Sequence, residues 1–168
     1  MRKIISFFGS LSLIFLSLHT ATAADVSITI NGRVVATPCT VSTPTAEIDL
    51  GVLYSADFVT AGSTSGWQAF TLNLSNCPIG TSKVTATFSG TSDSSNSYYA
   101  NTGNATNMAI QLADSDGTNL KNGSSKVVQV NDNSKSAALN LKVRAITTQG
   151  KAAQGSIQSI INVTYTYS

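Results

Sequence analysis

The chain has 168 residues with a formal net charge of +2 at pH 7, and only 11% of the residues are charged. This length suits one ordinary domain, and the small, nearly balanced charge excludes the basic surface that binds nucleic acid or anionic lipid. The sequence holds one histidine, His19, and two cysteines. Catalysis by a Ser-His-Asp or Cys-His system therefore has almost no candidate residues.

The first 23 residues have the pattern of a secretory signal peptide. Arg2 and Lys3 precede an apolar run from Ile4 to Leu18, and Ala21-Thr22-Ala23 forms a small-residue cleavage site. The run is shorter than the roughly 20 apolar residues that a membrane span needs. Cleavage after Ala23 would remove His19 and leave 145 residues with eight basic and eight acidic side chains. We expect an exported, formally neutral protein with no membrane segment after signal cleavage.

The next stretch, Ala24 to Val35, alternates between polar and apolar side chains. This period of two predicts a strand, and it lies before the first cysteine. Gly32 interrupts the apolar row, which otherwise ends at Val34. The strand could fold back into its own domain, or it could pair with another molecule. The apolar row consists of Val26, Ile28, Ile30, Gly32 and Val34.

Cys39 and Cys77 are the only cysteines. In an exported domain, two cysteines predict one disulfide bond. Closing a loop of about 39 residues would stabilise the fold by roughly 4 kcal/mol on the chain-entropy account. The sequence has no second pair and no CxxC motif, so it does not indicate a metal site or a redox site.

Period-two alternation then continues along the chain. In the segment from Ala46 to Tyr54, the row of Ile48, Leu50 and Val52 is predicted to face inward. The polar stretch from Thr91 to Asn107 is predicted to be a surface loop around Tyr98 and Tyr99. Seven or so half-buried strands joined by Gly, Asn, Asp and Ser turns predict an all-β, immunoglobulin-like sandwich. The strand segments are 46–54, 66–77, 82–90, 107–113, 126–130, 137–146 and 155–168.

The last predicted strand runs to the final residue, whereas a sandwich strand ordinarily ends in a turn or a tail. Its apolar row starts near Gly155, is broken by Ser159, and reaches the penultimate position. The remaining members of the row are Ile157, Ile161, Val163, Tyr165 and Tyr167.

Two carboxylate pairs could in principle form a glycosidase dyad. Glu47 and Asp49 flank an apolar segment and are better explained as its solvent-facing side. Asp114 and Asp116 belong to a turn that ends in Gly117, and this turn lacks the other ligands of a calcium loop. Trp67, the lone tryptophan, is better explained as a packed aromatic side chain than as a sugar platform. We therefore expect no enzyme activity, cofactor or metal.

Taken together, these features resemble the pilin subunits of chaperone–usher fimbriae. The resemblance covers the chain from Ala24 onward. It rests on the alternating extension with Gly32, on Cys39 just after it with Cys77 as its partner, and on the terminal pattern from Gly155 to Tyr167. Each feature alone is weak, but their combination behind a signal peptide is specific. The similarity is greatest to minor tip subunits of type 1 fimbriae.

The resemblance implies an immunoglobulin-like sandwich that lacks its last strand. A periplasmic chaperone lends a strand to the open groove, and at the outer-membrane usher the extension of the next subunit replaces that strand. Residues 24–37 would be the donor extension and residues 38–168 the pilin domain. Val26, Ile28, Ile30, Gly32 and Val34 would enter a neighbour's groove. Gly155, Ile157, Ile161, Val163, Tyr165 and Tyr167 would line the chain's own groove.

The function implied is that of a minor structural subunit, an adaptor between an adhesin and another minor pilin at the tip of a cell-surface fimbria. One alternative is a major pilin, which uses the same mechanism at a different place in the fibre. Another is a small secreted carbohydrate-binding sandwich, which would be a stable monomer whose extension is dispensable.

Overall fold

The structure, a computed structural model, describes residues 27–35 and 37–168. The expected signal peptide, and Val26 of the apolar row, lie outside the described residues. The chain divides into two units after Arg33. The fold described below is that of the second unit.

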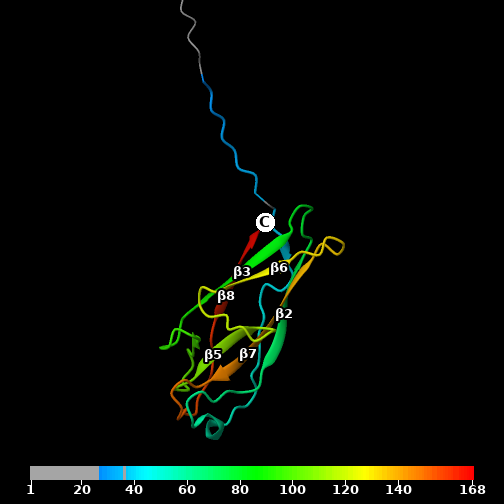
Figure 1. The fold of residues 1–168 in the computed structure, drawn as a ribbon. Helices are drawn as coiled ribbons and strands as arrows, with labels where there is room; N and C mark the ends of the chain where they lie inside the picture. Colours follow the sequence, from blue (N-terminus) through cyan, green and yellow to red (C-terminus); the bar gives the residue numbers. More distant parts are fainter. Residues whose placement is uncertain (1–26, 36) are drawn as a thin grey trace, which may run out of the picture. The chain divides into compact units, whose positions relative to one another are not determined.

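Residues 34–168 form two antiparallel sheets (Figure 1). One has five strands in the order β1-β2-β7-β5-β4, and the other has three in the order β6-β3-β8. A 3-10 turn, η1, covers Ser55–Phe58. This arrangement confirms the predicted all-β, immunoglobulin-like sandwich. The strands are β1 (Thr40–Val41), β2 (Gln68–Ser75), β3 (Lys83–Gly90), β4 (Tyr99–Ala100), β5 (Ala109–Asp114), β6 (Ser125–Gln129), β7 (Ala137–Ile146) and β8 (Ile161–Tyr167).

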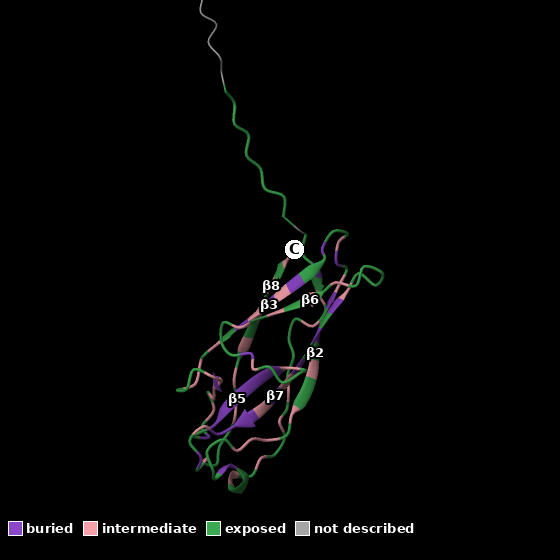
Figure 2. Ribbon diagram, viewed as in Figure 1, coloured by how far each residue is buried: buried purple, intermediate pink, exposed green. Residues whose placement is uncertain are grey.

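The core lies between the two sheets, where β3 and β7 contribute one fully buried row each (Figure 2). Val84, Ala86 and Phe88 of β3 are completely buried, and the polar residues between them face away from the core. Alternation in sequence becomes alternation in burial because successive strand side chains point to opposite faces. The predicted strands at 66–77, 82–90, 126–130 and 137–146 are confirmed, with β7 matching its predicted bounds.

The predicted strand at 46–54 is wrong. This segment forms no strand, although Ile48, Leu50 and Leu53 pack against the core. Gly51 has a φ of 72°, and its N–H donates to Asp49 Oδ1 at 2.8 Å. Such a turn shifts the inward row by one residue. Val52, predicted to face inward, is consequently 82% exposed, and Leu53 takes its place.

The expected surface loop at 91–107 contains a buried residue, Tyr99. This residue forms β4, pairs with Ile110 of β5 and is fully buried, which corrects the prediction. Its ring lies against Gly90, where an added Cβ would come within 2.9 Å of Tyr99 Cδ1. The buried Tyr99 hydroxyl makes no hydrogen bond within the described chain, and burial raises the pKa of Tyr99 to about 12.

We predict that Tyr99→Phe raises the free energy of unfolding by about 1 kcal/mol, because it removes a buried polar atom without leaving a hole. Urea unfolding of the mature chain with its disulfide intact measures the change. Tyr98→Phe, at a half-buried neighbouring position, serves as the control and should be neutral. A loss of stability in Tyr99→Phe would mean that the hydroxyl has a partner in solution.

One ion pair connects the two sheets. Asp114 ends β5 of the five-stranded sheet, Lys126 belongs to β6 of the three-stranded sheet, and both side chains are mostly buried. Burial by itself raises the pKa of Asp114, but hydrogen bonds from Lys126 and Ser115 outweigh it and hold that pKa below its ordinary value of 3.8. A carboxyl group with a lowered native pKa stabilises the fold above its ordinary pKa, and this stabilisation is lost as the pH falls through the lowered value.

We predict that Asp114→Asn lowers the free energy of unfolding at neutral pH by about 1–3 kcal/mol, because a charge-assisted hydrogen bond is lost. The difference in unfolding free energy between Asp114→Asn and wild type should shrink as the pH falls below 3.8, because the wild-type carboxylate then becomes protonated and loses its charge. Urea unfolding at several acidic pH values measures this difference in stability. Asp132→Asn, on an exposed turn, is the control. A gap between Asp114→Asn and wild type that does not change with pH would contradict the assignment.

Candidate functional site: the edge of β8

β8 is the last strand of the chain and lies at the edge of the three-stranded sheet. Among the described residues, it pairs with β3 alone, in a register that runs from Val84 opposite Tyr167 to Gly90 opposite Ile161. β6 occupies the other side of β3. One long side of β8 is therefore without a partner strand in the described chain, and an edge of this kind is a template for adding a strand.

The backbone hydrogen bonds show which residues of β8 face the unpaired side. Ser168 and Lys83 exchange both backbone hydrogen bonds, at 2.8 and 3.1 Å. In an antiparallel ladder, hydrogen-bonded pairs alternate with non-bonded pairs, so the residues two, four and six positions before Ser168 also bond to β3. The intervening residues direct their N–H and C=O groups away from β3. We call these four residues, Ile161, Val163, Tyr165 and Tyr167, the β8 edge residues.

The same four residues point their side chains toward the core but remain only half-buried. By contrast, Leu139 and Leu141 of β7 are 0% and 2% exposed. Burial raises the pKa of Tyr165, with a further contribution from Tyr167, and it also raises the pKa of Tyr167. The β8 edge residues thus combine free backbone groups with an incompletely covered apolar row.

The predicted terminal strand is longer than the one observed, because residues 155–160 are not in a strand. This segment is instead tied to the loop at 101–105. The carbonyl of Ser156 accepts from the N–H of Ala105 at 3.1 Å, and the carbonyl of Gln158 accepts from the N–H of Thr102 at 2.7 Å. Ile157 continues the half-buried row. At Gly155 the backbones approach so closely that a Cβ would lie 2.5 Å from the Ala105 nitrogen.

The described part of the N-terminal extension, residues 27–35, forms no strand. Ile28 is 79% exposed, Ile30 is 89% exposed and Val34 is fully exposed. Nothing lies within 4 Å of the place where a Gly32 side chain would begin. Exposing apolar side chains to water is unfavourable. This segment therefore has the alternating composition of a half-buried strand, but its apolar row is exposed.

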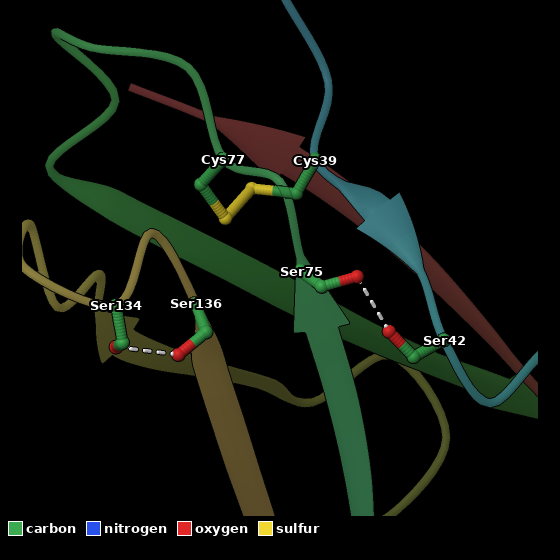
Figure 3. The surroundings of a disulfide bond; sticks show 6 residues. All are labelled: Cys39, Ser42, Ser75, Cys77, Ser134 and Ser136. Carbon is green, nitrogen blue, oxygen red and sulfur yellow. Dashed lines mark hydrogen bonds between the residues drawn. A yellow bond between two sulfur atoms is a disulfide. The ribbon is translucent and has the colours of Figure 1, made fainter.

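The predicted disulfide is confirmed between Cys39 and Cys77 (Figure 3). Cys39 immediately precedes β1, and Cys77 lies two residues beyond β2. Next to it, the hydroxyls of Ser42 and Ser75 hydrogen-bond to each other at 2.7 Å, as Figure 3 shows. The disulfide therefore joins the start of the domain, where the extension is attached, to the end of β2.

The other candidate residues make contacts that stabilise the fold. Asp114 is in the ion pair with Lys126, and Asp116 accepts a hydrogen bond from the N–H of Thr118 at 2.7 Å within the turn. Trp67 has two cationic neighbours, Arg144 at 4.2 Å and Lys142 at 5.0 Å from the ring centroid, which favours packing over sugar stacking.

Within residues 27–35 and 37–168, no three side chains of the metal-ligating types gather into a possible metal site. None of the helices in this part of the chain is long and apolar enough to cross a membrane.

Comparison with known proteins identifies the family. The sequence profile of the fimbrial protein family matches residues 28–168. Protein FimG of Escherichia coli K12 is 52% identical over 94% of this chain and 93% of its own length. An uncharacterised fimbrial-like protein of the same strain, YdeR, is 50% identical over 91% and 92%. The P pilus rod subunit PapA has a similar fold, with a TM-score of 0.65 and 21% identity over 79% of this chain and all of PapA.

The chain belongs to the fimbrial protein family and is a structural subunit of a surface pilus. Subunits of such fibres assemble with other pilins. The relatives are fimbrial proteins, a class whose role is structural. The resemblance inferred from the extension, the cysteines and the terminal strand is therefore confirmed.

We predict that amide hydrogens along β8 exchange with solvent in an alternating pattern. The amides of Thr164 and Thr166 should be protected by β3, whereas those of Val163 and Tyr165 should exchange faster, by about a hundredfold or more. Hydrogen exchange followed by NMR on the purified mature chain measures this. The amides of β7, which is paired on both sides, provide the protected reference. Equal protection along β8 would show that another segment covers the edge.

Proposed function

We propose that the chain is a minor adaptor subunit that polymerises by donor-strand exchange and links a tip adhesin to the rest of a type 1-like fimbria. The single observation that carries the mechanism is the β8 edge, where free backbone groups and a half-covered apolar row coincide on Ile161, Val163, Tyr165 and Tyr167. An added strand satisfies both at once.

The extension has the composition that such an edge needs. Val26, Ile28, Ile30 and Val34 would fill successive positions of a neighbour's groove. At about 1.5–3 kcal/mol for each buried side chain, they would contribute roughly 6–12 kcal/mol before the cost of ordering the strand. Gly32 would face a shallow part of that groove, because glycine brings no side chain. The polar row between them would face solvent.

The two ends of the chain then have complementary roles. Residues 24–37 donate to one neighbour, and the β8 edge accepts from another. Contacts of this head-to-tail kind produce open filaments. An unpaired edge is also an aggregation hazard before assembly. A periplasmic chaperone would lend a strand to the β8 edge until the outer-membrane usher exchanges it for the next subunit's extension. The signal peptide, residues 1–23, would direct the chain into this route to the fimbrial tip.

Residue parity provides a sharp test of donation. We predict that Ile28→Asp together with Ile30→Asp reduces incorporation into fibres at least about tenfold, since burying either charge costs more than the roughly 1.4 kcal/mol that a tenfold change requires. Thr29→Asp changes the opposite row of the same segment and should incorporate normally. Deletion of residues 24–35 should abolish donation while leaving a chaperone complex that still accepts a strand. Incorporation is measured by immunoblotting of sheared, purified fibres.

Normal incorporation of the deletion variant would overturn the donor role. Copy number in the same fibre preparations separates the adaptor from the major pilin: an adaptor is present once or a few times per fibre, and a major pilin forms most of it. A stable monomer that does not bind the chaperone and keeps its stability after the extension is deleted would instead favour a secreted carbohydrate-binding sandwich.

A further inference from the structure

The connection between the extension and the domain is short. Val34, the last member of the apolar row, lies five residues before Cys39. Five residues span at most about 18 Å when fully extended. If Val34 is buried in the groove of an acceptor subunit, Cys39 must lie within this distance of the same groove. The disulfide end of the donor domain is thus kept within about 18 Å of the acceptor groove.

The disulfide determines which surface is brought there. The Cα atoms of Cys39 and Cys77 are 4.2 Å apart, and Ile79 follows two residues after Cys77. Two extended residues add about 7 Å. Ile79 therefore lies close to the attachment point of the extension, whatever the path of the linker.

Ile79 is presented on a tight turn. The N–H of Thr81 donates to the carbonyl of Pro78 at 3.1 Å, and Gly80 has a φ of 95°, which a glycine adopts without strain. Thr81 is buried and anchors the turn, whereas Ile79 is 93% exposed. A single exposed isoleucine is ordinary on a protein surface, but this one lies on a hydrogen-bonded turn close to the linker that would connect the domain to a neighbour.

A second turn lies beside it. The N–H of Cys77 donates to the carbonyl of Lys135 at 2.9 Å, which joins the Pro78–Thr81 turn to the turn after β6. Between them is an open hollow of about 350 Å³, whose lining includes Ile79, Asp132 and Lys135. The lining thus combines exposed apolar side chains with two oppositely charged ones at its border, as the centre and the polar rim of a protein–protein contact do.

We propose that the Pro78–Thr81 turn is a second contact between successive subunits, which packs on the acceptor domain beside the end of its donor-binding groove and fixes the angle between the two domains. This inference rests on the proposed donor-strand function. A donor strand that runs antiparallel to the acceptor's β8, as all named strand pairs of this domain do, places its Val34 end where β8 begins. On this chain that end carries Ile160, which directly precedes β8 and is 69% exposed. The partner is thus a second pilin domain, with apolar contact on both sides.

Two complete mature chains joined in one polypeptide test this proposal. A loop of about four residues connects Ser168 of the first copy to Ala24 of the second, so that the second copy's extension can turn back and run antiparallel along the first copy's β8 edge. A C-terminal repeat of residues 24–35 after a similar loop closes the second copy's groove. NMR relaxation then reports whether the two domains tumble together.

We expect the wild-type tandem to tumble as one body. Ile79→Asp in the second copy should uncouple the domains and lower the rotational correlation time toward that of a single complemented domain. Val127→Asp, which places the same charge at an exposed apolar position of β6, should leave the domains coupled. Independent tumbling in the wild-type tandem, or coupled tumbling in Ile79→Asp, would overturn the proposal.

The amides of Val163 and Tyr165 in the first copy separate this inference from the proposed function. Their protection in the tandem shows that the donor strand has entered the β8 edge, so the domain contact is judged by itself. If these amides stay unprotected, the donor-strand function fails, and the second contact fails with it.

Discussion

The pairing of β8 with β3 is the constraint on which the rest of this structure depends. It holds the last strand in register, places the inward side chains against the core, where they are half-buried, and directs the backbone groups of every second residue away from β3. Without β3, the backbone of the terminal segment would have no partner strand to hydrogen-bond with. With β3 alone, it is a strand that lacks cover on one side. The unpaired backbone groups and the half-buried apolar row of β8 thus coincide on the same residues, and these are the residues to which the proposed function assigns strand addition.

The disulfide fixes the place at which the extension leaves the domain. It ties the root of the extension to the end of β2, close to the Pro78–Thr81 turn. The chain consequently has two functional regions with different physical properties. The extension has one exposed apolar row and no secondary structure in its described part, whereas the domain is held by strand pairing, a disulfide and the Asp114–Lys126 ion pair. Under the proposed function, the extension supplies the apolar contacts with a neighbour and the domain supplies a folded scaffold.

Sequence patterns predict the strands in which apolar and polar side chains alternate clearly, whether the strand lies inside a sheet, as β7 does, or at an edge, as β6 does. β7 was predicted to the residue because Leu139, Leu141 and Val143 face one core and the residues between them face solvent. The prediction failed where a turn changed the parity, as at Gly51, and where tertiary contacts captured a segment, as in residues 155–160. It also failed for Tyr99, since the Ser- and Asn-rich residues around it give no sign that one ring is buried against Gly90.

The sequence by itself determined the class of fold, the disulfide and the family, because these follow from composition, period and the placement of two cysteines. It also determined that the extension has one apolar row. Only the tertiary structure decided which residues of the last strand direct their backbone groups away from β3, where the described chain offers them no partner strand. That property depends on the hydrogen-bond register with β3, and a register exists only once the two strands are paired. The position of Ile79 beside the root of the extension was decided in the same way, by a covalent bond between residues that are 38 positions apart in the sequence.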